Sequence, residues 1–351
     1  MEYVDVAIVG GGVIGANVAL EVTDRNPRLS VAVLERNLVG TGASTHSAGV
    51  HFPRGATPWV RDLTLRSHQQ WHRLRGRFQL PITSVEAFVV ADTESRDSVE
   101  QAYISQSALQ ATERPANQEW KAPAGRCVWR AQGCHYADVA GVTRRLFSHL
   151  RSQVTIWEGT DVVGIDAEES GVTVTLGQGT LLRAGTVVIA PGPWATLPVW
   201  AEPLRDLGVR VKKVAAVHIE SVPHRSAPLT IFHDEDAFLV PLHRRGHWLF
   251  SYTCDEWDVD AMTMTGQLDA RTLASAREVL AQYSPDLAQR CKSGRVFCDA
   301  YSPSREPVVA EVAPGVIFAG AANGAGYRLA PAIAQEAAQL VDLRRNASAQ
   351  T

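Results

Sequence analysis

Apolar and polar residues follow one another at the N-terminus in the order that a βαβ unit requires. The apolar run Val4–Val9 ends at glycines, which is typical of a buried parallel strand. Val13–Thr23 has the spacing of a helix, and Ser30–Glu35 is a second apolar run. Strand, glycine-rich turn, helix and strand therefore predict one βαβ unit at the start of the chain.

The following stretch predicts capped helices, one strand and one loop. Residues 57–77 form a helix in this prediction, because a threonine N-cap precedes a proline at the first helical position. Ser84–Ala91 is typical of a strand, and Ser95–Ala111 of a polar, exposed helix. Residues 113–126, rich in proline, alanine and glycine, indicate a surface loop, and Asp138 is placed to cap a helix that ends at Arg151.

From Val154 the pattern changes to short strands separated by turns. The expected strands are VTIW, TDVVGID, GVTVTL and TVVIA, and then Val209–Ile219, Phe238–Val240, His247–Tyr252, Val308–Val312 and Gly315–Ala319. An amphipathic helix is expected over Leu268–Tyr283, and a final helix over Pro331–Arg344. The chain therefore begins and ends with α/β features around a β-rich middle.

Composition excludes several classes of function. The 351 residues carry a net charge of -3, which gives no reason to expect nucleic acid as a partner. Five cysteines without a C-x-x-C pair argue against a zinc site or a disulfide framework, and favour a reducing cytoplasm. We see no signal peptide, and no apolar run reaches the ~18 residues that cross a bilayer. No metal site is expected.

The turn after the first strand matches the dinucleotide-binding motif G-x-G-x-x-G. Gly10 permits the tight turn, Gly12 lets the backbone approach a pyrophosphate, and Gly15 lets the helix pack on the strand. Glu35 stands at the end of the second strand, where a carboxylate accepts hydrogen bonds from ribose hydroxyls. This acid also disfavours NADP, whose 2′-phosphate requires a cation. The motif alone leaves FAD and NAD open.

Three further segments give the chain a resemblance to the D-amino-acid oxidase family of flavoproteins. After Glu35-Arg36 comes the small-residue loop GTGASTHSAG (40–49), and TVVIAPGPWA (186–195) resembles the family's strand and turn. GAANGAGYRLAP (320–331) resembles its C-terminal flavin loop and helix start. The resemblance spans nearly the whole chain and implies FAD as the cofactor.

The resemblance implies a set of cofactor residues and a domain organisation. The expected FAD-binding residues are Gly10, Gly12, Val13, Ile14, Gly15, Glu35, Arg36, Ala43, Ser44, Thr45, His46, Val162, Gly192, Trp194, Gly324, Gly326, Arg328 and Leu329. The expected fold is α/β. A Rossmann-type FAD-binding domain is assembled from residues 1–83, 139–208 and 296–351. The α+β substrate domain, with a mostly antiparallel sheet, comprises 84–138 and 209–295.

Substrate residues follow from the same comparison. Tyr327-Arg328 stands where sarcosine oxidase-like enzymes carry a basic residue for the substrate carboxylate, and Arg54 falls near a second basic position. A guanidinium fork suits such a carboxylate. Asp299 stands where many amino-acid oxidases carry an arginine, and it could meet a substrate cation or pair with a nearby arginine such as Arg305.

Other positions depart from the family pattern or leave choices open. Leu249 stands where sarcosine oxidase-like enzymes have a lysine for oxygen activation, which leaves room for an acceptor other than oxygen. Cys298 is one residue away from the covalent cysteine of those enzymes, so a flavin held without a covalent bond is expected. The stretch from His46 to His51 resembles flavin-linked and 2-hydroxyglutarate dehydrogenase sequences, and makes His51 a candidate catalytic residue.

The resemblance thus predicts an enzyme that oxidises the C–N bond of an amino acid or N-substituted amino acid by hydride transfer to the flavin, giving an imine that hydrolyses. Its partners would be a small amino-acid-like carboxylate and oxygen or another electron acceptor. Two alternatives are a 2-hydroxy-acid dehydrogenase of the same fold and a non-catalytic FAD-binding subunit of a larger complex.

Overall fold

The first predicted strand lies at the centre of the sheet that carries the glycine-rich turn. In the computed structural model, which describes residues 2–112, 119–264 and 266–348, β1 (Glu2–Val9) pairs in parallel with two neighbours. These are β2 (Val31–Leu34) and β12 (Leu181–Ile189). Residues 6–8 are fully buried, as expected for an apolar strand between parallel neighbours.

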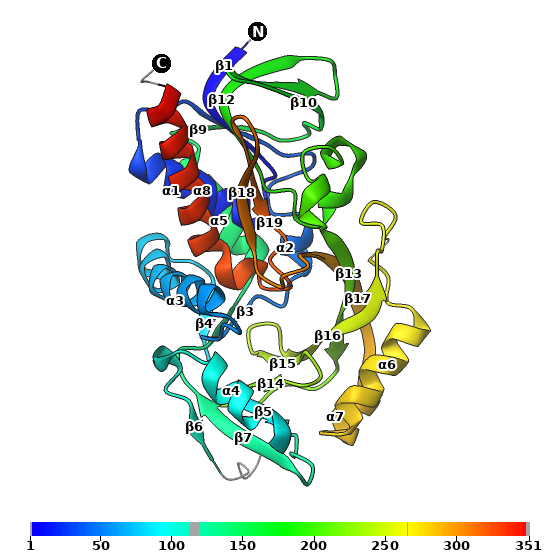
Figure 1. Cartoon of the computed structure of the whole chain (residues 1–351). Coiled ribbons are helices and arrows are strands. Elements are labelled where there is room, and N and C mark those ends of the chain that lie inside the picture. Colours follow the sequence, from blue (N-terminus) through cyan, green and yellow to red (C-terminus); the bar gives the residue numbers. More distant parts are fainter. Residues whose placement is uncertain (1, 113–118, 265, 349–351) are drawn as a thin grey trace.

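Further strands extend this first sheet on both sides. Its order is β10–β11–β12–β1–β2–β9, and β19 joins it parallel to β12 with β18 antiparallel beside it. These strands are β9 (Val154–Trp157), β10 (Val162–Glu168), β11 (Gly171–Leu176), β18 (Val308–Ala313) and β19 (Val316–Gly320). One face is covered by α1 (Val13–Arg25), α5 (Val139–Leu150) and α8 (Gly326–Ser348), as Figure 1 shows.

A second sheet is mostly antiparallel, with the order β17–β13–β16–β15–β14–β5–β7–β6. Its strands are β5 (Ala87–Asp92), β6 (Gln110–Ala111), β7 (Arg126–Ala131), β13 (Arg210–Ile219), β14 (Leu229–Phe232), β15 (Ala237–Leu242), β16 (His247–Trp257) and β17 (Cys291–Tyr301). The helices α6 (Ala270–Ala281) and α7 (Pro285–Gln289) pack on one face of it. The predicted α/β fold with a second, mostly antiparallel sheet is confirmed.

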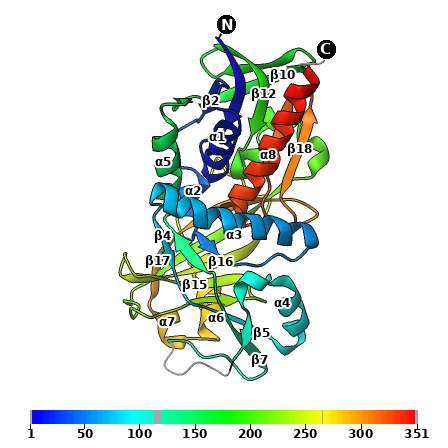
Figure 2. The same cartoon turned by 90° about the vertical axis from the view of Figure 1, so that its left-hand side faces the viewer.

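A long helix and a small sheet lie between the two large sheets. Figure 2 shows α3 (Pro58–Phe78) running across the molecule at this level. The small sheet has the order β3 (Val50–His51), β8 (His135–Ala137) and β4 (Ile82–Ser84). Two short α-helices, α2 (Ala43–His46) and α4 (Arg96–Ala102), also belong to the first half of the chain. The predicted caps are confirmed: Thr57 accepts from the Val60 N–H, and Asp138 from the Gly141 N–H.

Two predicted helices are wrong in extent. The polar helix expected over Ser95–Ala111 ends at Ala102, because residues 102–104 pair with residues 53–55 instead. Tertiary hydrogen bonds here outweigh local helix propensity. The last helix begins at Gly326 rather than at Pro331, so the proline lies inside the helix. Of the predicted loop at 113–126, residues 113–118 lie outside the described residues, and 119–125 contain neither helix nor strand.

Within the described ranges, no helix is both long and apolar enough to cross a membrane. The division into an FAD-binding and a substrate domain stays a prediction. What the fold does establish is that the glycine-rich turn, residues 42–47 and residues 320–327 meet around one cavity.

Candidate active site

The cavity is built on the turn between β1 and α1. Gly10 has φ +108°, and a Cβ atom there would lie 2.3 Å from the Ala190 carbonyl oxygen. A Cβ at Gly15 would lie 1.9 Å from the Gly10 oxygen, so this glycine permits close packing and does not line the cavity. A Cβ at Gly12 would meet nothing closer than the Ser44 Oγ at 3.4 Å, and this glycine faces the cavity. The positive end of α1 is therefore open to an anionic group.

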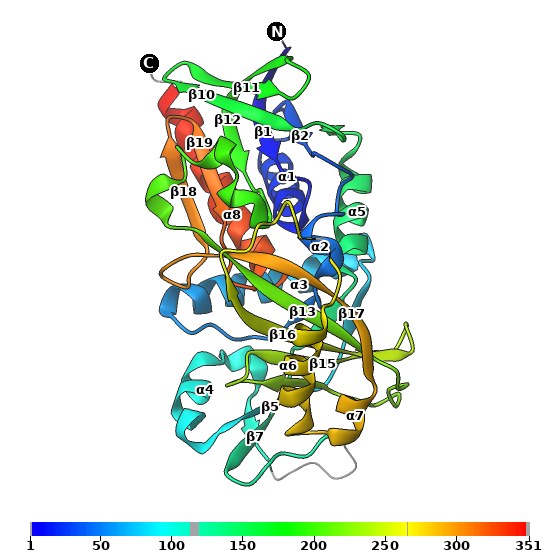
Figure 3. The ribbon, with the colours of Figure 1, turned by 90° about the vertical axis from the view of Figure 1, so that its right-hand side faces the viewer.

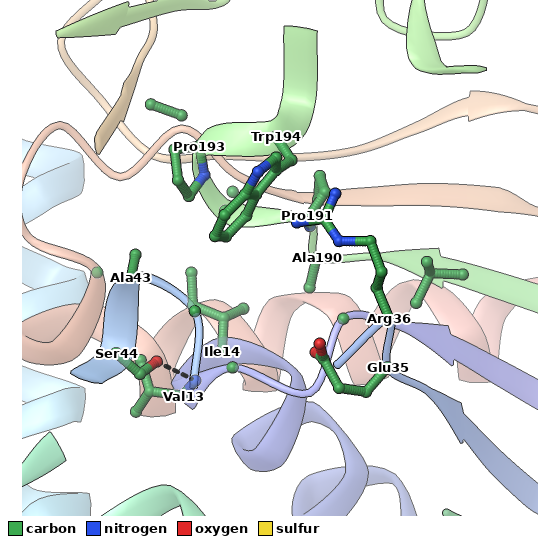
Figure 4. Close-up of a pocket in the computed structure, with 18 of the residues that line it drawn as sticks. Val13, Ile14, Glu35, Arg36, Ala43, Ser44, Ala190, Pro191, Pro193 and Trp194 are labelled. Carbon is green, nitrogen blue, oxygen red and sulfur yellow. Dashed lines mark hydrogen bonds between the residues drawn. The ribbon is translucent and has the colours of Figure 1, made fainter. Parts of the chain in front are cut away.

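The end of β2 supplies an oriented carboxylate. Glu35 accepts hydrogen bonds from the Gly11 N–H at 2.7 Å and the Asn37 N–H at 2.8 Å. Beside it, the Arg36 guanidinium lies 4.8 Å from the centre of the Trp194 ring, and Figure 4 shows both side chains on the wall of the cavity. Polar groups at the strand end and an aromatic surface are what a bound nucleotide requires.

The remaining walls come from segments far apart in the sequence. Ser44 accepts a hydrogen bond from the Val13 N–H at 3.0 Å, which joins residues 42–47 to the first turn of α1 (Figure 4). The C-terminal loop 320–327 closes another side, and its Asn323 accepts from the Ser302 N–H at 3.0 Å. The cavity thus runs from the glycine-rich turn to the start of α8, which fits an elongated dinucleotide such as FAD.

Most predicted cofactor residues line this cavity. They are Gly10, Gly12, Val13, Ile14, Glu35, Arg36, Ala43, Ser44, Val162, Gly192, Trp194, Gly324 and Gly326. Thr45, His46, Arg328 and Leu329 do not line it in the described structure: the Thr45 hydroxyl donates to the Gly40 oxygen, and Leu329 is 1% exposed within the core. Sequence reasoning missed Ser47, which lies within the segment 40–49, and seven residues outside the glycine-rich motifs: Asn37, Val139, Thr160, Asp161, Leu197, Val199 and Trp200.

Two predicted substrate residues, Arg54 and Arg328, lie together at the start of α8. Arg328 donates from Nη1 to the Arg54 carbonyl oxygen, and its guanidinium lies 4.6 Å from the Phe52 ring centre. Burial, and then the Arg54 cation, lower the pKa of Arg328 to about 10, so it stays protonated at neutral pH. In the part of the chain that the structure describes, neither arginine forms an ion pair, and the Arg54 Nε and the Tyr103 hydroxyl are buried without partners.

Asp299 brings an acid to the same region. It lies on β17 and lines the cofactor cavity next to Ala300. Burial, and then the Asp236 carboxylate, raise the pKa of Asp299 to about 6. The predicted alternative of an ion pair with Arg305 is absent from the described residues. Asp236 also interacts electrostatically with Arg328, so the carboxylates of Asp236 and Asp299 and the guanidinium of Arg328 lie near one another.

His51 lies behind this region rather than on the cavity wall. Its side chain is 0% exposed, and its ring is stacked on His135 with centroids 4.6 Å apart. One ring nitrogen is 3.1 Å from His68, and His135 in turn contacts the Tyr327 hydroxyl at 2.9 Å. Burial lowers the pKa values of His51 and His135, the latter to about 3, so both rings are neutral. Tyr327 lines the cavity, whereas His51 reaches it only through its neighbours.

Comparison with known proteins agrees with this geometry. A family model described as FAD dependent oxidoreductase matches residues 5–340. The glycine oxidase of Geobacillus kaustophilus is 28% identical over 268 residues, which cover 68% of this chain and 67% of that protein.

Solved structures share the fold. The crystal structure of that glycine oxidase has a TM-score of 0.80 at 21% identity and covers 98% of this chain and 95% of its own. The crystal structure of L-proline dehydrogenase from P. horikoshii has a TM-score of 0.83 at 17% identity, with 97% and 93% covered.

Proposed function

The chain belongs to the family of FAD-dependent oxidoreductases of the amino-acid oxidase type, and we propose that it oxidises the C–N bond of an amino acid or N-substituted amino acid. The observation that carries this proposal is that Arg54 and Arg328 lie together beside a cavity that fits FAD, and that neither forms an ion pair among the described residues. Two guanidinium groups that form no ion pair among the described residues favour a bound carboxylate, which would offset their repulsion.

The second feature in support is Asp299, the acid that lines the same cavity. An amine loses hydride from its neighbouring carbon only in the neutral form, so the substrate ammonium must first give up a proton. With its pKa raised to about 6, Asp299 is ionised near neutral pH and could accept that proton, or hold the ammonium in place.

In this proposal Arg54 and Arg328 bind the carboxylate and fix the direction in which the substrate lies. Tyr327, fully packed between Trp71 and the cavity, shapes the wall and excludes water. When bound, FAD would supply the two-electron acceptor for the hydride of the substrate carbon, and the imine product would be hydrolysed by water. His51 positions this arrangement from behind and does not itself touch the substrate.

The test is anaerobic mixing of the purified yellow protein with a panel of amino acids, N-substituted amino acids and 2-hydroxy acids, while the flavin absorbance is recorded. We expect the amino-acid members to bleach the flavin. Bleaching by 2-hydroxy acids alone would favour a hydroxy-acid dehydrogenase, and no bleaching by any member would favour a non-catalytic subunit. Reoxidation by air, compared with a dye acceptor, then identifies the class of electron acceptor.

A further inference from the structure

A second cavity borders the cofactor cavity and shares Ser44, Ser47 and Val139 with it. Three arginines line this second cavity: Arg244 and Arg245 in the turn between β15 and β16, and Arg295 on β17. Figure 3 shows β17 passing beside α2, the helix that carries Ser44. None of the residues around the Arg54–Arg328 pair belongs to this lining, so it is a separate site.

Arg295 is half-buried, whereas Arg244 and Arg245 are exposed. Its Nη1 lies 2.8 Å from the His218 Nε2, and its Nη2 donates to the His46 carbonyl oxygen at 3.1 Å. Its Nε is buried and has no hydrogen-bond partner. The guanidinium is therefore held by neutral groups only, and one of its donors is unsatisfied, which costs free energy unless a ligand meets it.

The charges around the second cavity are not balanced. Asp138 is the one carboxylate among its described lining residues, and it already caps α5 through the Gly141 N–H. Within the described ranges none of the three arginines forms an ion pair. The adjoining His218 and His46 have pKa values lowered by burial and by Arg295, so their rings are neutral and add no positive charge of their own. An uncompensated cluster of cations in a concave site attracts anions.

We propose that the second cavity binds a small anion carrying a carboxylate or phosphate group, held by Arg295 with Arg244 and Arg245. The guanidinium fork matches the planar carboxylate and the phosphate oxygens equally, so the chemistry common to both is a compact group with two or more anionic oxygens. Leu249, which is 1% exposed, gives the site one apolar wall. Because Ser44 and Ser47 line both cavities, the bound anion would lie next to the segment 42–47 that borders the cofactor cavity.

Calorimetric titration of the FAD-loaded protein at low ionic strength tests this proposal, with inorganic phosphate and acetate as probes and chloride at matched ionic strength as the blank. We expect binding of at least one probe, and a loss of affinity of about 30-fold or more in Arg295→Gln, as for removal of one side of a buried charged pair. The two probes distinguish a phosphate from a carboxylate preference. Binding of neither probe would overturn the proposal.

Two further variants control for location and folding. Arg271→Gln, an exposed arginine on α6 outside the site, should bind the probe like the wild type. Arg328→Gln should also bind it, and loss of binding there with retention in Arg295→Gln would show that the anion sits at the proposed substrate site instead. If Arg295→Gln loses FAD, the double variant Arg244→Gln/Arg245→Gln changes exposed side chains only, and unchanged affinity in it would contradict the proposal.

Discussion

Replacing Arg328 by alanine is the sharpest perturbation of the proposed substrate site. The guanidinium is partly buried, stays charged at neutral pH, and forms no ion pair within the described structure. In the free protein, removal of the Arg328 guanidinium breaks no ion pair and relieves repulsion with Arg54. The melting temperature should therefore not fall because of a lost ion pair. In the substrate complex it removes one side of a charge-assisted pair in a desolvated site, which costs about 2–5 kcal/mol.

That cost converts into a fall of about 30-fold or more in the second-order rate constant for flavin reduction. Stopped-flow mixing with the best amino acid of the panel measures it, and FAD content is determined on the same sample. Arg328→Lys should recover part of the loss, because lysine keeps the charge and loses the fork. The matched control is Arg345→Ala, an exposed arginine in the last turn of the same helix, which should behave as the wild type.

Flavin reduction at the wild-type rate in Arg328→Ala would refute the reasoning. Parallel losses of FAD and of activity would instead assign Arg328 to the cofactor. Neither result would bear on the anion site proposed at Arg295, because Arg54 and Arg328 do not line that cavity.

Four more outcomes are expected. Gly12→Asp should purify without FAD, because a carboxylate there would face the pyrophosphate at the open end of α1; absorbance of the purified protein measures this. Acid precipitation should release the flavin as FAD, and a yellow pellet would point to a covalent bond, with His46 the first residue to replace. The rate of flavin reduction should rise with pH through about 6 as Asp299 ionises, and this limb should vanish in Asp299→Asn; an unchanged profile would exclude Asp299 as the proton acceptor. Burial lowers the pKa of His135 to about 3, against ~6.5 in the unfolded chain, so the unfolded chain binds more protons as the pH falls below ~6.5. The unfolding free energy should therefore fall by about 1.4 kcal/mol per pH unit in that range because of this residue. Urea unfolding at a series of pH values should show a weaker dependence of this free energy on pH in His135→Asn.

The parts of the site that the sequence predicts are those with local causes. The turn at 10–15 is encoded by glycines whose missing side chains permit close approaches, and Glu35 follows from its place at the end of the second strand of the βαβ unit. The small-residue segments at 40–49 and 320–331 carry enough of a family pattern to be recognised without any contact information. These segments do meet around one cavity.

What the sequence does not predict depends on contacts between distant segments. Nothing local indicates that the chain after Ala102 leaves its helix to pair with residues 53–55 and so fixes Arg54. The placement of His51 in a stack behind the cavity, and of Arg295 beside His46, likewise follows only from the packing of strands far apart in the chain. Periodicity describes one segment at a time, whereas these positions are set by which segments become neighbours.

Pro331, inside α8, has a consequence for how this protein could be adapted. It has no N–H for the Tyr327 carbonyl, so the first turns of α8 are anchored from α3: the Trp71 indole donates to the Arg328 oxygen at 3.3 Å, and the Ser67 hydroxyl accepts from the Ala332 N–H at 3.2 Å. The backbone that carries the Arg328 side chain is thereby held by Trp71 and Ser67, which do not line the cofactor cavity. Substitutions in α3 could therefore shift Arg328 in the proposed carboxylate site without changing the residues that line the cofactor cavity.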